Sequence, residues 1–357
     1  MTEPRDAAGR IAVVGGGLAG ALLTWRLARA PYALSVDLFT GPPDGFWDDA
    51  THASGGLVRG FETQGDLAEA AGASLTELLG DPRLRQWADY RETGAVYALP
   101  PHPDIEDLVK TVDRQLPGSV RTVGREELRS GFGLQGLPDD TVGVAERTAG
   151  YIAPRRLRDA VLVDLSGPAV RVRHERVAAV TEDRGIRLAE GALRGYDAVV
   201  VAAGAWTPRL LAASGLDDQG LRTKQIQYSL FPGRVPGLGT FVDETTGLYG
   251  RCTPDGATLL GLPTDRWDVD PSGLQVDAAV AGRVLAVARS RLDLSDLGSV
   301  KVTTITAADC YSTPAGLKLR ALTPGLFTFT GGSGGAAKTA LAASRTAAEH
   351  IGSGGWS

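Results

Sequence analysis

The chain opens with an apolar run that leads into a glycine-rich turn. Residues 11–14 are all apolar, glycines follow over 15–20, and apolar residues then recur at helical spacing over 21–30. A short apolar run, a glycine turn and a helical pattern predict a strand–turn–helix unit. A second apolar run at 35–39 supplies the next strand, so residues 11–39 are expected to form a βαβ unit.

The rest of the chain alternates between helical and strand patterns. Helical spacing predicts helices at 65–80, 82–91, 105–115 and 278–292, with one more starting at Pro154. Apolar runs predict strands at 170–173, 177–182, 196–201 and 326–330, and alternating segments between 223 and 262 predict an antiparallel sheet. The last strand runs into a glycine loop and a helix through Ile351. This order predicts an α/β fold with α+β elements.

Gly15, Gly17 and Gly20 have the G-x-G-x-x-G spacing of a dinucleotide-binding turn. The first glycine permits the tight turn, the second lets the backbone approach a pyrophosphate, and the third lets the helix pack against the strand. N–H groups at the helix start, beside Leu18 and Ala19, favour an anionic group. The sequence therefore predicts a site for an ADP moiety.

The acidic residue that usually binds the ribose at the end of the second strand is missing. Thr40 stands at that position, and Asp37 lies inside the strand. Either the Thr40 hydroxyl or backbone binds the ribose or Asp37 substitutes for it, and we favour Thr40.

Composition narrows the class of protein. The chain has 357 residues, 43% of them hydrophobic and 22% charged, with a net charge of −5. These values are typical of a globular protein large enough for two joined domains, and the absence of a basic block argues against nucleic-acid or anionic-membrane partners. No apolar run is long enough to span a membrane, and the first ten residues do not resemble a signal peptide, so we expect a cytoplasmic protein.

Two cysteines and four separated histidines give little support for disulfides or a metal site. We therefore expect no metal.

Four segments together resemble the D-amino-acid oxidase/sarcosine oxidase (DAO) superfamily of FAD enzymes. They are the N-terminal glycine turn, Tyr-Ile-Ala-Pro at 151–154, the apolar strand ending in Ala-Gly-Ala-Trp at 203–206, and the closing strand, glycine loop and helix. A generic Rossmann dehydrogenase, the alternative, would not account for the last of these.

The resemblance implies a Rossmann-like, glutathione-reductase-like FAD-binding domain and an antiparallel-sheet substrate domain. The expected FAD-binding domain comprises residues 1–80, 145–220 and 300–357, and the substrate domain comprises 81–144 and 221–299. Besides the glycine turn with Leu18, Ala19 and Thr40, the implied cofactor-binding residues are Thr51, Ser54, Gly55, Val177, Ala203, Gly204, Trp206, Cys310, Gly332, Gly334, Gly335, Ala336 and Lys338.

The C-terminal glycine loop is a candidate for contact with both flavin and substrate. The resemblance implies that the N–H groups of Gly334, Gly335 and Ala336 face the pyrimidine end of the flavin, where reduction develops negative charge. Lys338 matches the lysine that sarcosine oxidases use to bind the substrate carboxylate, with a solvated first-turn lysine as the alternative. A phosphate-binding P-loop is disfavoured because Ala337 replaces the required glycine.

Cys310 departs from the family pattern. Amino-acid oxidases of the superfamily carry an arginine here that clamps the substrate carboxylate, and the aspartate further along the run is Ala315 in this chain. Sarcosine oxidases instead have a cysteine nearby that is bonded to the flavin. Cys310 could bind FAD covalently, or it could be a small buried residue.

Three further residues are catalytic candidates. Arg59 ends a glycine-rich loop that in relatives reaches the substrate, although a structural role fits equally. Arg251 falls near a lysine that helps sarcosine oxidases to reduce O2, and Tyr249, like Tyr228 and Tyr311, could line a pocket. No general base stands out, which is tolerable for hydride transfer from an unprotonated amine.

These observations together predict an FAD-dependent oxidoreductase that oxidises the C–N bond of an amino acid or secondary amine to an imine, with O2 as acceptor. The missing arginine clamp favours a bulkier or carrier-bound amine, as in a biosynthetic tailoring pathway. The alternatives are a flavin dehydrogenase that reduces a quinone or a protein, and a flavin-binding subunit without catalysis. We expect a monomer or a homodimer.

Overall fold

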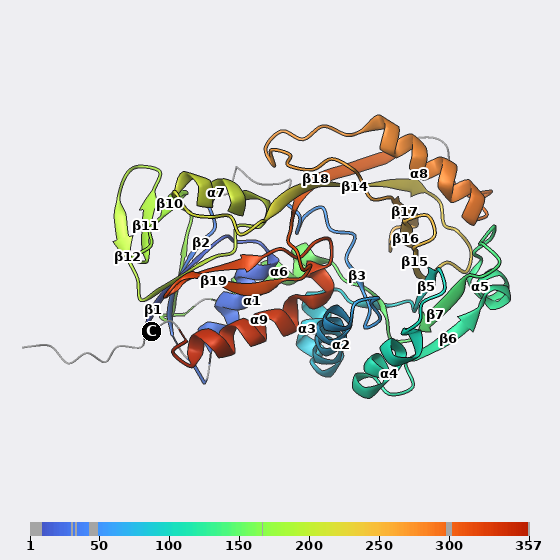
Figure 1. The fold of residues 1–357 in the computed structure, drawn as a ribbon, viewed down its shortest axis with the longest axis horizontal. Coiled ribbons are helices and arrows are strands. Elements are labelled where there is room, and N and C mark those ends of the chain that lie inside the picture. The colour runs from blue at the N-terminus through green and yellow to red at the C-terminus, as the bar shows by residue number, and fades with distance from the viewer. Residues whose placement is uncertain are drawn as a thin grey trace, which may run out of the picture.

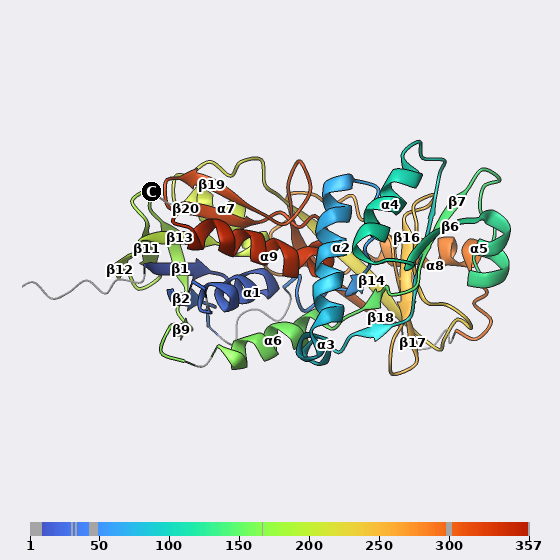
Figure 2. The same cartoon turned by 90° about the horizontal axis from the view of Figure 1, so that it is seen from below.

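The computed structural model describes residues 9–29, 31–32, 34–42, 49–165, 167–297 and 302–355. Two large sheets lie side by side along the long axis of the molecule, with helix α2 (Gly65–Gly80) between them (Figures 1 and 2). Helix α2 packs against α9 (Ala336–Gly352) of the first layer and against α4 (Ile105–Gln115) of the second. In the described part of the chain, no helix is both long and apolar enough to cross a membrane.

The first sheet has six strands in the order β19-β20-β13-β1-β2-β9. Neighbouring strands run parallel, except that β19 pairs antiparallel with β20. The strands are β1 (Arg10–Val14), β2 (Ser35–Phe39), β9 (Val170–Arg173), β13 (Ala198–Val201), β19 (Lys318–Thr323) and β20 (Leu326–Thr330). Because both faces of such a sheet are covered, β1 and β13 consist almost entirely of apolar residues.

Alternation along β1 distributes its side chains between two cores. Ile11 and Val13 join a cluster with helices α1 (Leu18–Leu27), α6 (Pro154–Asp164) and α9. Ala12 and Val14 join a second cluster on the opposite face. That face is covered by the meander β10 (Val177–Val180), β11 (Gly185–Leu188) and β12 (Leu193–Gly195) and by α7 (Thr207–Ala213), which follows the short helix η1 (Gly204–Trp206).

The second sheet has eight strands in the order β18-β14-β17-β16-β15-β5-β7-β6. Only the pair β15–β5 is parallel. The predicted antiparallel sheet is confirmed by β14 (Arg222–Pro232), β15 (Thr240–Asp243), β16 (Leu248–Cys252) and β17 (Ala257–Gly261). Helix α8 (Ala278–Arg291) packs against β14, β16 and β17. Burial alternates along β14, so one face of this strand lies in the core and the other faces a cavity.

Three of the eight strands of the second sheet come from a region where the sequence predicted no strands. These are β5 (Ala95–Leu99), β6 (Val120–Gly124) and β7 (Val142–Glu146), with α5 (Arg125–Phe132) following β6. The strand β18 (Thr303–Tyr311) pairs along its whole length with β14. It therefore belongs to the second sheet, whereas the predicted domain boundary at residue 300 assigned it to the first domain.

The remaining predicted helices agree with the structure apart from their ends. Helices at 65–80 and 105–115 are confirmed as α2 and α4, and the helix expected over 82–91 ends earlier, as α3 (Pro82–Trp87). A small third sheet joins the two layers through β3 (Leu57–Val58), β8 (Gly150–Tyr151) and β4 (Arg91–Glu92).

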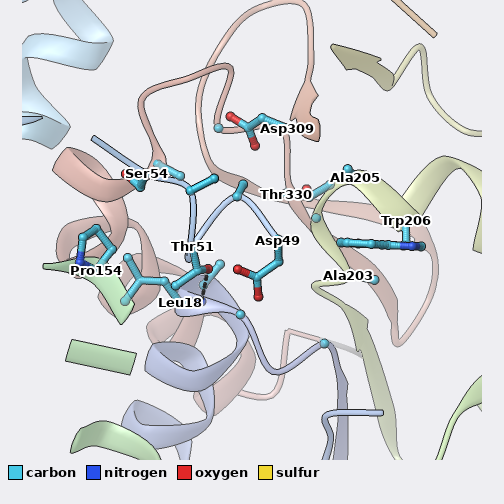
Figure 3. A pocket seen from close by; sticks show the side chains of 18 of the residues that line it. Leu18, Asp49, Thr51, Ser54, Pro154, Ala203, Ala205, Trp206, Asp309 and Thr330 are labelled. Carbon is cyan, nitrogen blue, oxygen red and sulfur yellow. Dashed lines mark hydrogen bonds between the residues drawn. The ribbon is translucent and has the colours of Figure 1, made fainter. Parts of the chain in front are cut away.

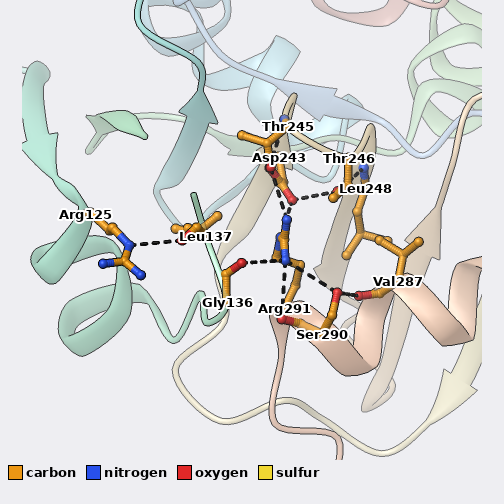
Figure 4. Close-up of polar contacts among 10 residues, drawn as sticks. All are labelled: Arg125, Gly136, Leu137, Asp243, Thr245, Thr246, Leu248, Val287, Ser290 and Arg291. Atoms are coloured by element: carbon orange, nitrogen blue, oxygen red, sulfur yellow. Dashed lines mark hydrogen bonds and ion pairs between the residues drawn. The ribbon is translucent and has the colours of Figure 1, made fainter. Parts of the chain in front are cut away.

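A buried ion pair fastens the end of α8 to the second sheet (Figure 4). Arg291 Nε donates to Asp243 Oδ2 at 2.8 Å, and Arg291 Nη1 donates to the Gly136 carbonyl oxygen at 2.8 Å. The Asp243 carboxylate also accepts from the hydroxyls of Thr245 and Thr246, both at 2.6 Å. The Asp243 side chain is fully buried and that of Arg291 is 10% exposed, so neither charge is well solvated.

We predict that Arg291→Ala lowers the free energy of unfolding by about 3–5 kcal/mol, because it leaves the Asp243 carboxylate buried without its counter-ion. Urea unfolding of the purified protein measures this change. Arg289→Ala on the same helix is the control: Arg289 is exposed, and its removal should change stability by no more than about 0.5 kcal/mol. Equal, small effects of the two substitutions would contradict the prediction.

Candidate active site

A cavity of about 1370 Å³ lies between the two sheets. Its lining begins at the glycine turn after β1 and passes Thr51 and Trp206 (Figure 3). It ends at Tyr228 and Tyr249 on the second sheet. Of the predicted site residues, Gly20, Arg251 and Cys310 lie outside this lining. The lining includes Gly15, Gly17, Leu18, Ala19, Thr40, Thr51, Ser54, Gly55, Arg59, Val177, Ala203, Gly204, Trp206, Tyr249, Gly332, Gly334, Gly335, Ala336 and Lys338.

The glycine turn is close-packed where the motif requires it. Gly15 has a φ of 125°, and a Cβ there would lie 2.2 Å from the Ala202 carbonyl oxygen at the end of β13. A Cβ on Gly20 would lie 2.0 Å from the Gly15 carbonyl oxygen. No side chain fits at either position. Gly20 therefore acts through helix–strand packing and not by lining the cavity.

The N-terminus of α1 opens into the cavity beside the loop that contains Thr51. The Thr51 hydroxyl accepts a hydrogen bond from the Leu18 N–H at 3.0 Å (Figure 3). It thereby satisfies one of the N–H groups that lack a partner inside the helix. Asp49 on the same loop also lines the cavity and accepts from the His52 N–H at 2.6 Å.

The structure separates the two candidates for the ribose site. Thr40 lines the cavity, and its Oγ1 lies 2.9 Å from His174 Nδ1. Asp37 is 1% exposed and is held by Arg10 at 3.0 Å and by the Tyr196 hydroxyl at 2.8 Å. Burial by itself would raise the pKa of Asp37, but these hydrogen bonds and the nearby arginines lower it. Asp37 is therefore a structural ion-pair partner, and its candidacy as the ribose ligand is wrong.

The C-terminal loop lines the cavity, but two of its three candidate N–H groups already donate hydrogen bonds within the protein. The Gly334 N–H donates to Asp309 Oδ2 at 2.8 Å, and the Gly335 N–H donates to the Gly332 carbonyl oxygen at 2.8 Å. The cavity end of α9 begins at Ala336, where the first N–H groups have no partner within the helix. Ala336, with Ala337, is therefore the part of this loop suited to an anionic partner.

Lys338 and Arg59 share one buried carboxylate that the sequence analysis did not identify. Glu62 Oε1 lies 2.7 Å from Lys338 Nζ and 2.9 Å from Arg59 Nη2. The side chains of Glu62, Arg59 and Lys338 are only 8–11% exposed, so the solvated alternative for Lys338 is wrong.

The three charges shift each other's pKa values. Burial opposes ionisation of Glu62, but the charges of Arg59 and Lys338 outweigh it, so the pKa of Glu62 is lowered. Burial lowers the pKa of Lys338, and Glu62 offsets this only in part. The corner of the cavity where α9 begins is thus an ion cluster in which two cations share one carboxylate.

Arg251 and Tyr249 differ in their relation to the cavity. Tyr249 lines it, and its hydroxyl lies 3.4 Å from the Gln227 carbonyl oxygen. Arg251 Nε instead donates to the Gly55 carbonyl oxygen at 2.7 Å, and its guanidinium stacks on the Tyr151 ring, 4.1 Å from the centroid. These contacts position the cavity loop at Gly55 and make Arg251 a positioning residue.

Cys310 points away from the cavity. Asp309 and Tyr311 line it, and because side chains alternate along β18, the thiol between them points to the opposite face. It is 1% exposed and packs with Leu211 and Leu221. Burial raises the pKa of the thiol to about 11, which disfavours the nucleophilic thiolate. The geometry supports the small buried residue and argues against a covalent link to a flavin.

Several charged residues of the cavity were missed by the sequence analysis. Asp309, Lys224 and Glu244 line it, and Glu244 accepts a hydrogen bond from the Tyr97 hydroxyl at 2.7 Å. None belongs to a motif. Alternation along β14 and β18 could have indicated that Lys224 and Asp309 face inward, but Glu244 follows the end of β15 and gave no such signal. The structure describes no group of three His, Cys, Asp or Glu side chains that could hold a metal ion.

Comparisons with known proteins agree with this geometry. The model of the family described as FAD dependent oxidoreductase (DAO) matches residues 10–350. No curated protein sequence matches the chain.

Solved structures with the same fold include L-proline dehydrogenase from P. horikoshii (15% identity, TM-score 0.77, 98% of this chain and 94% of that chain). Glycine oxidase from Geobacillus kaustophilus is similar, with 19% identity and a TM-score of 0.74 over 96% of this chain and 94% of that chain. Iminodiacetate oxidase from Chelativorans sp. has 20% identity and a TM-score of 0.72 over 96% of this chain and 95% of that chain. With a family match over nearly its whole length and a cavity that starts at a dinucleotide-binding turn, the chain belongs to the DAO family of FAD-dependent oxidoreductases.

Proposed function

We propose that the protein binds FAD without a covalent link and oxidises the C–N bond of an amine or amino acid to an imine, with O2 as acceptor and H2O2 as product. The observation that carries this proposal is the continuous cavity, which runs from the N-terminus of α1 to the aromatic face of the second sheet. One end suits a nucleotide and the other a small organic substrate. The structures named above are a dehydrogenase of L-proline and oxidases of glycine and of iminodiacetate.

The residues of the cavity fit FAD. Its volume of about 1370 Å³ exceeds the roughly 300–1,000 Å³ of a site for one drug-sized ligand, which leaves room for a dinucleotide and a substrate. The glycine turn and the N-terminus of α1 would hold the pyrophosphate, and Thr40 would hold the ribose. Ala336 and Ala337 at the start of α9 would lie near the flavin pyrimidine, where their N–H groups favour negative charge.

When bound, FAD supplies the acceptor for the two electrons that leave the C–N bond. The protein chain orients the substrate and excludes water from the site of reaction. Tyr228, Tyr249 and Tyr311 present aromatic side chains to the cavity, and these exclude water and orient the C–H bond that breaks. Glu244 is the cavity carboxylate suited to accept a proton from a substrate ammonium, a role for which the sequence offered no candidate.

We assign Lys338 and Arg59 a positioning role in preference to the substrate clamp. Both cations already contact the Glu62 carboxylate, at 2.7 and 2.9 Å, so a substrate carboxylate would compete with a permanent partner. Through Glu62 they join the first turn of α9 to the loop after β3. This connection keeps the start of α9 and the glycine-rich loop at a constant separation across the cavity.

Glu62→Gln should lower the free energy of unfolding by about 3–5 kcal/mol at neutral pH, because two buried cations lose their counter-charge. Since the pKa of Glu62 is lowered by folding, its stabilisation is present above the unfolded pKa of about 4.3 and is lost as the pH falls through the lower folded value. The difference between wild type and variant should therefore shrink below about pH 4.

Urea unfolding at several pH values checks this prediction. The exposed Glu69 provides a matched control, since Glu69→Gln should be nearly neutral at every pH. A wild-type advantage that stays constant down to pH 3 would exclude the proposed ion cluster.

The absence of a covalent bond has a direct test. Acid precipitation of the purified holoprotein should release all of the flavin into the supernatant, and Cys310→Ser should retain FAD when native, since the thiol points away from the cavity. Absorbance spectra of pellet and supernatant give the result. Flavin that remains in the wild-type pellet and disappears from the Cys310→Ser pellet would establish the linkage.

Anaerobic titration tests the reaction itself. Glycine, L-proline, iminodiacetate, N-methyl amino acids and simple secondary amines are added to the holoprotein, and at least one should bleach the visible flavin absorbance. Readmission of air should restore the absorbance and yield one H2O2 per flavin. Dithionite is the control for a reducible flavin.

The alternatives give different results in the same titration. Bleaching that a quinone reverses and air does not would identify a dehydrogenase. A flavin that dithionite reduces and no amine of the panel reduces would favour a binding subunit without catalysis.

A further inference from the structure

The cations of the cavity are not equally compensated. Arg59 and Lys338 contact Glu62, as described above. Lys224 on β14 also lines the cavity, yet no carboxylate oxygen of the described residues lies within 4.0 Å of its Nζ. Burial lowers the pKa of Lys224 and the exposed Asp265 opposes this. Lys224 is therefore a cavity-lining cation without an ionic partner among the described residues. Arg176, just before β10, is another, but its side chain is exposed.

Aromatic rings hold Lys224 in place. Its Nζ lies 4.5 Å from the centroid of the Trp267 ring and 5.4 Å from that of Tyr311. A β-bridge between Lys224 and Trp267 fixes the backbones of these two residues. Cation–π contacts favour the charged amine in this position without neutralising it.

Two acidic side chains near Lys224 are committed elsewhere, and Asp265, which acts on its charge, is exposed and forms no ion pair with it within 4.0 Å. Asp309 lies opposite Lys224 in the β14–β18 register, but its two oxygens accept hydrogen bonds at 2.8 Å from the N–H groups of Cys310 and Gly334. Asp268 pairs with Arg222, whose Nε lies 2.9 Å from Asp268 Oδ1. Asp309 therefore braces the C-terminal loop and leaves Lys224 free to meet a ligand.

Position along the strand directs Lys224 to the substrate part of the cavity. Lys224, Ile226 and Tyr228 alternate along β14 on its less buried face, and all three line the cavity. Tyr311, which flanks Lys224, lies beside the C-terminal loop: a Cβ on Gly334 would be 3.2 Å from its hydroxyl. The amine thus lies on the face that covers the space next to this loop.

We propose that Lys224 binds a carboxylate of the substrate. A single ammonium with three donors suits a carboxylate that approaches from the cavity, while Trp267 and Tyr311 limit its movement. This inference rests on the proposed amine oxidation and names its substrate class: an amine that also carries a carboxylate, held on the β14 side of the cavity and not at the Glu62 cluster.

Ligand binding without turnover tests the assignment. Phenylacetate and phenylacetamide have similar shapes, and only the first is an anion at neutral pH. Each is titrated into the oxidised holoprotein, and the change in the flavin absorbance spectrum gives the dissociation constant. Wild type should bind phenylacetate at least about tenfold more tightly than phenylacetamide, the difference expected for a charge-assisted hydrogen bond.

Lys224→Gln should abolish this preference by weakening phenylacetate alone, and Lys224→Arg should retain most of it. Lys110→Gln is the control, because Lys110 is exposed on α4 and pairs with Asp107. The FAD content of each variant is measured in parallel. With a substrate from the amine panel, Lys224→Gln should raise KM at least about tenfold with little change in kcat.

Three results would overturn the proposal. They are equal affinity of wild type for the two probes, an unchanged preference in Lys224→Gln, and loss of FAD from Lys224→Gln with retention in Lys224→Arg, which would assign the amine to the cofactor. The titration needs bound flavin and no catalysis. A protein that prefers phenylacetate through Lys224 but is reduced by no amine would therefore refute the proposed function while leaving the anion site established.

Discussion

The buried Glu62 carboxylate is the contact on which the geometry of the cavity depends. It pairs with Arg59 on its own loop and with Lys338 in the first turn of α9, so it joins the N-terminal and C-terminal parts of the chain. A second buried carboxylate, Glu146 of β7, accepts from the N–H groups of Gly60 and Phe61 and connects the same loop to the second sheet. Two acidic residues thus hold three separate segments around one space.

Strand alternation decides which chemistry faces that space. On β18 it turns Asp309 and Tyr311 toward the cavity and Cys310 into an apolar cluster. On β14 it turns Lys224 and Tyr228 inward. The same geometric rule therefore points the thiol away from the cavity and the lysine toward it.

Ion pairing then distinguishes cations that hold the protein together from cations that could contact a ligand. Arg59, Lys338 and Arg251 all donate to acceptors within the protein, and each holds a cavity loop in place. Lys224 is flanked by aromatic rings, which stabilise its charge without cancelling it. A residue type alone does not reveal this difference, because it depends on what lies within a few ångströms of each head group.

The sequence by itself determined the dinucleotide-binding turn, most helices and the central antiparallel strands, because these depend on local spacing: glycines at 15, 17 and 20, helical periodicity at 65–80, and alternation along 225–231. It also indicated Thr40 in preference to Asp37. Only the tertiary structure decided that β5–β7 complete the second sheet and that β18 belongs to it, since pairing between distant strands leaves little local signal. The structure likewise decided that Glu62 pairs with both Lys338 and Arg59 and that Cys310 faces the core, because burial and ion pairing are set by neighbours far along the chain.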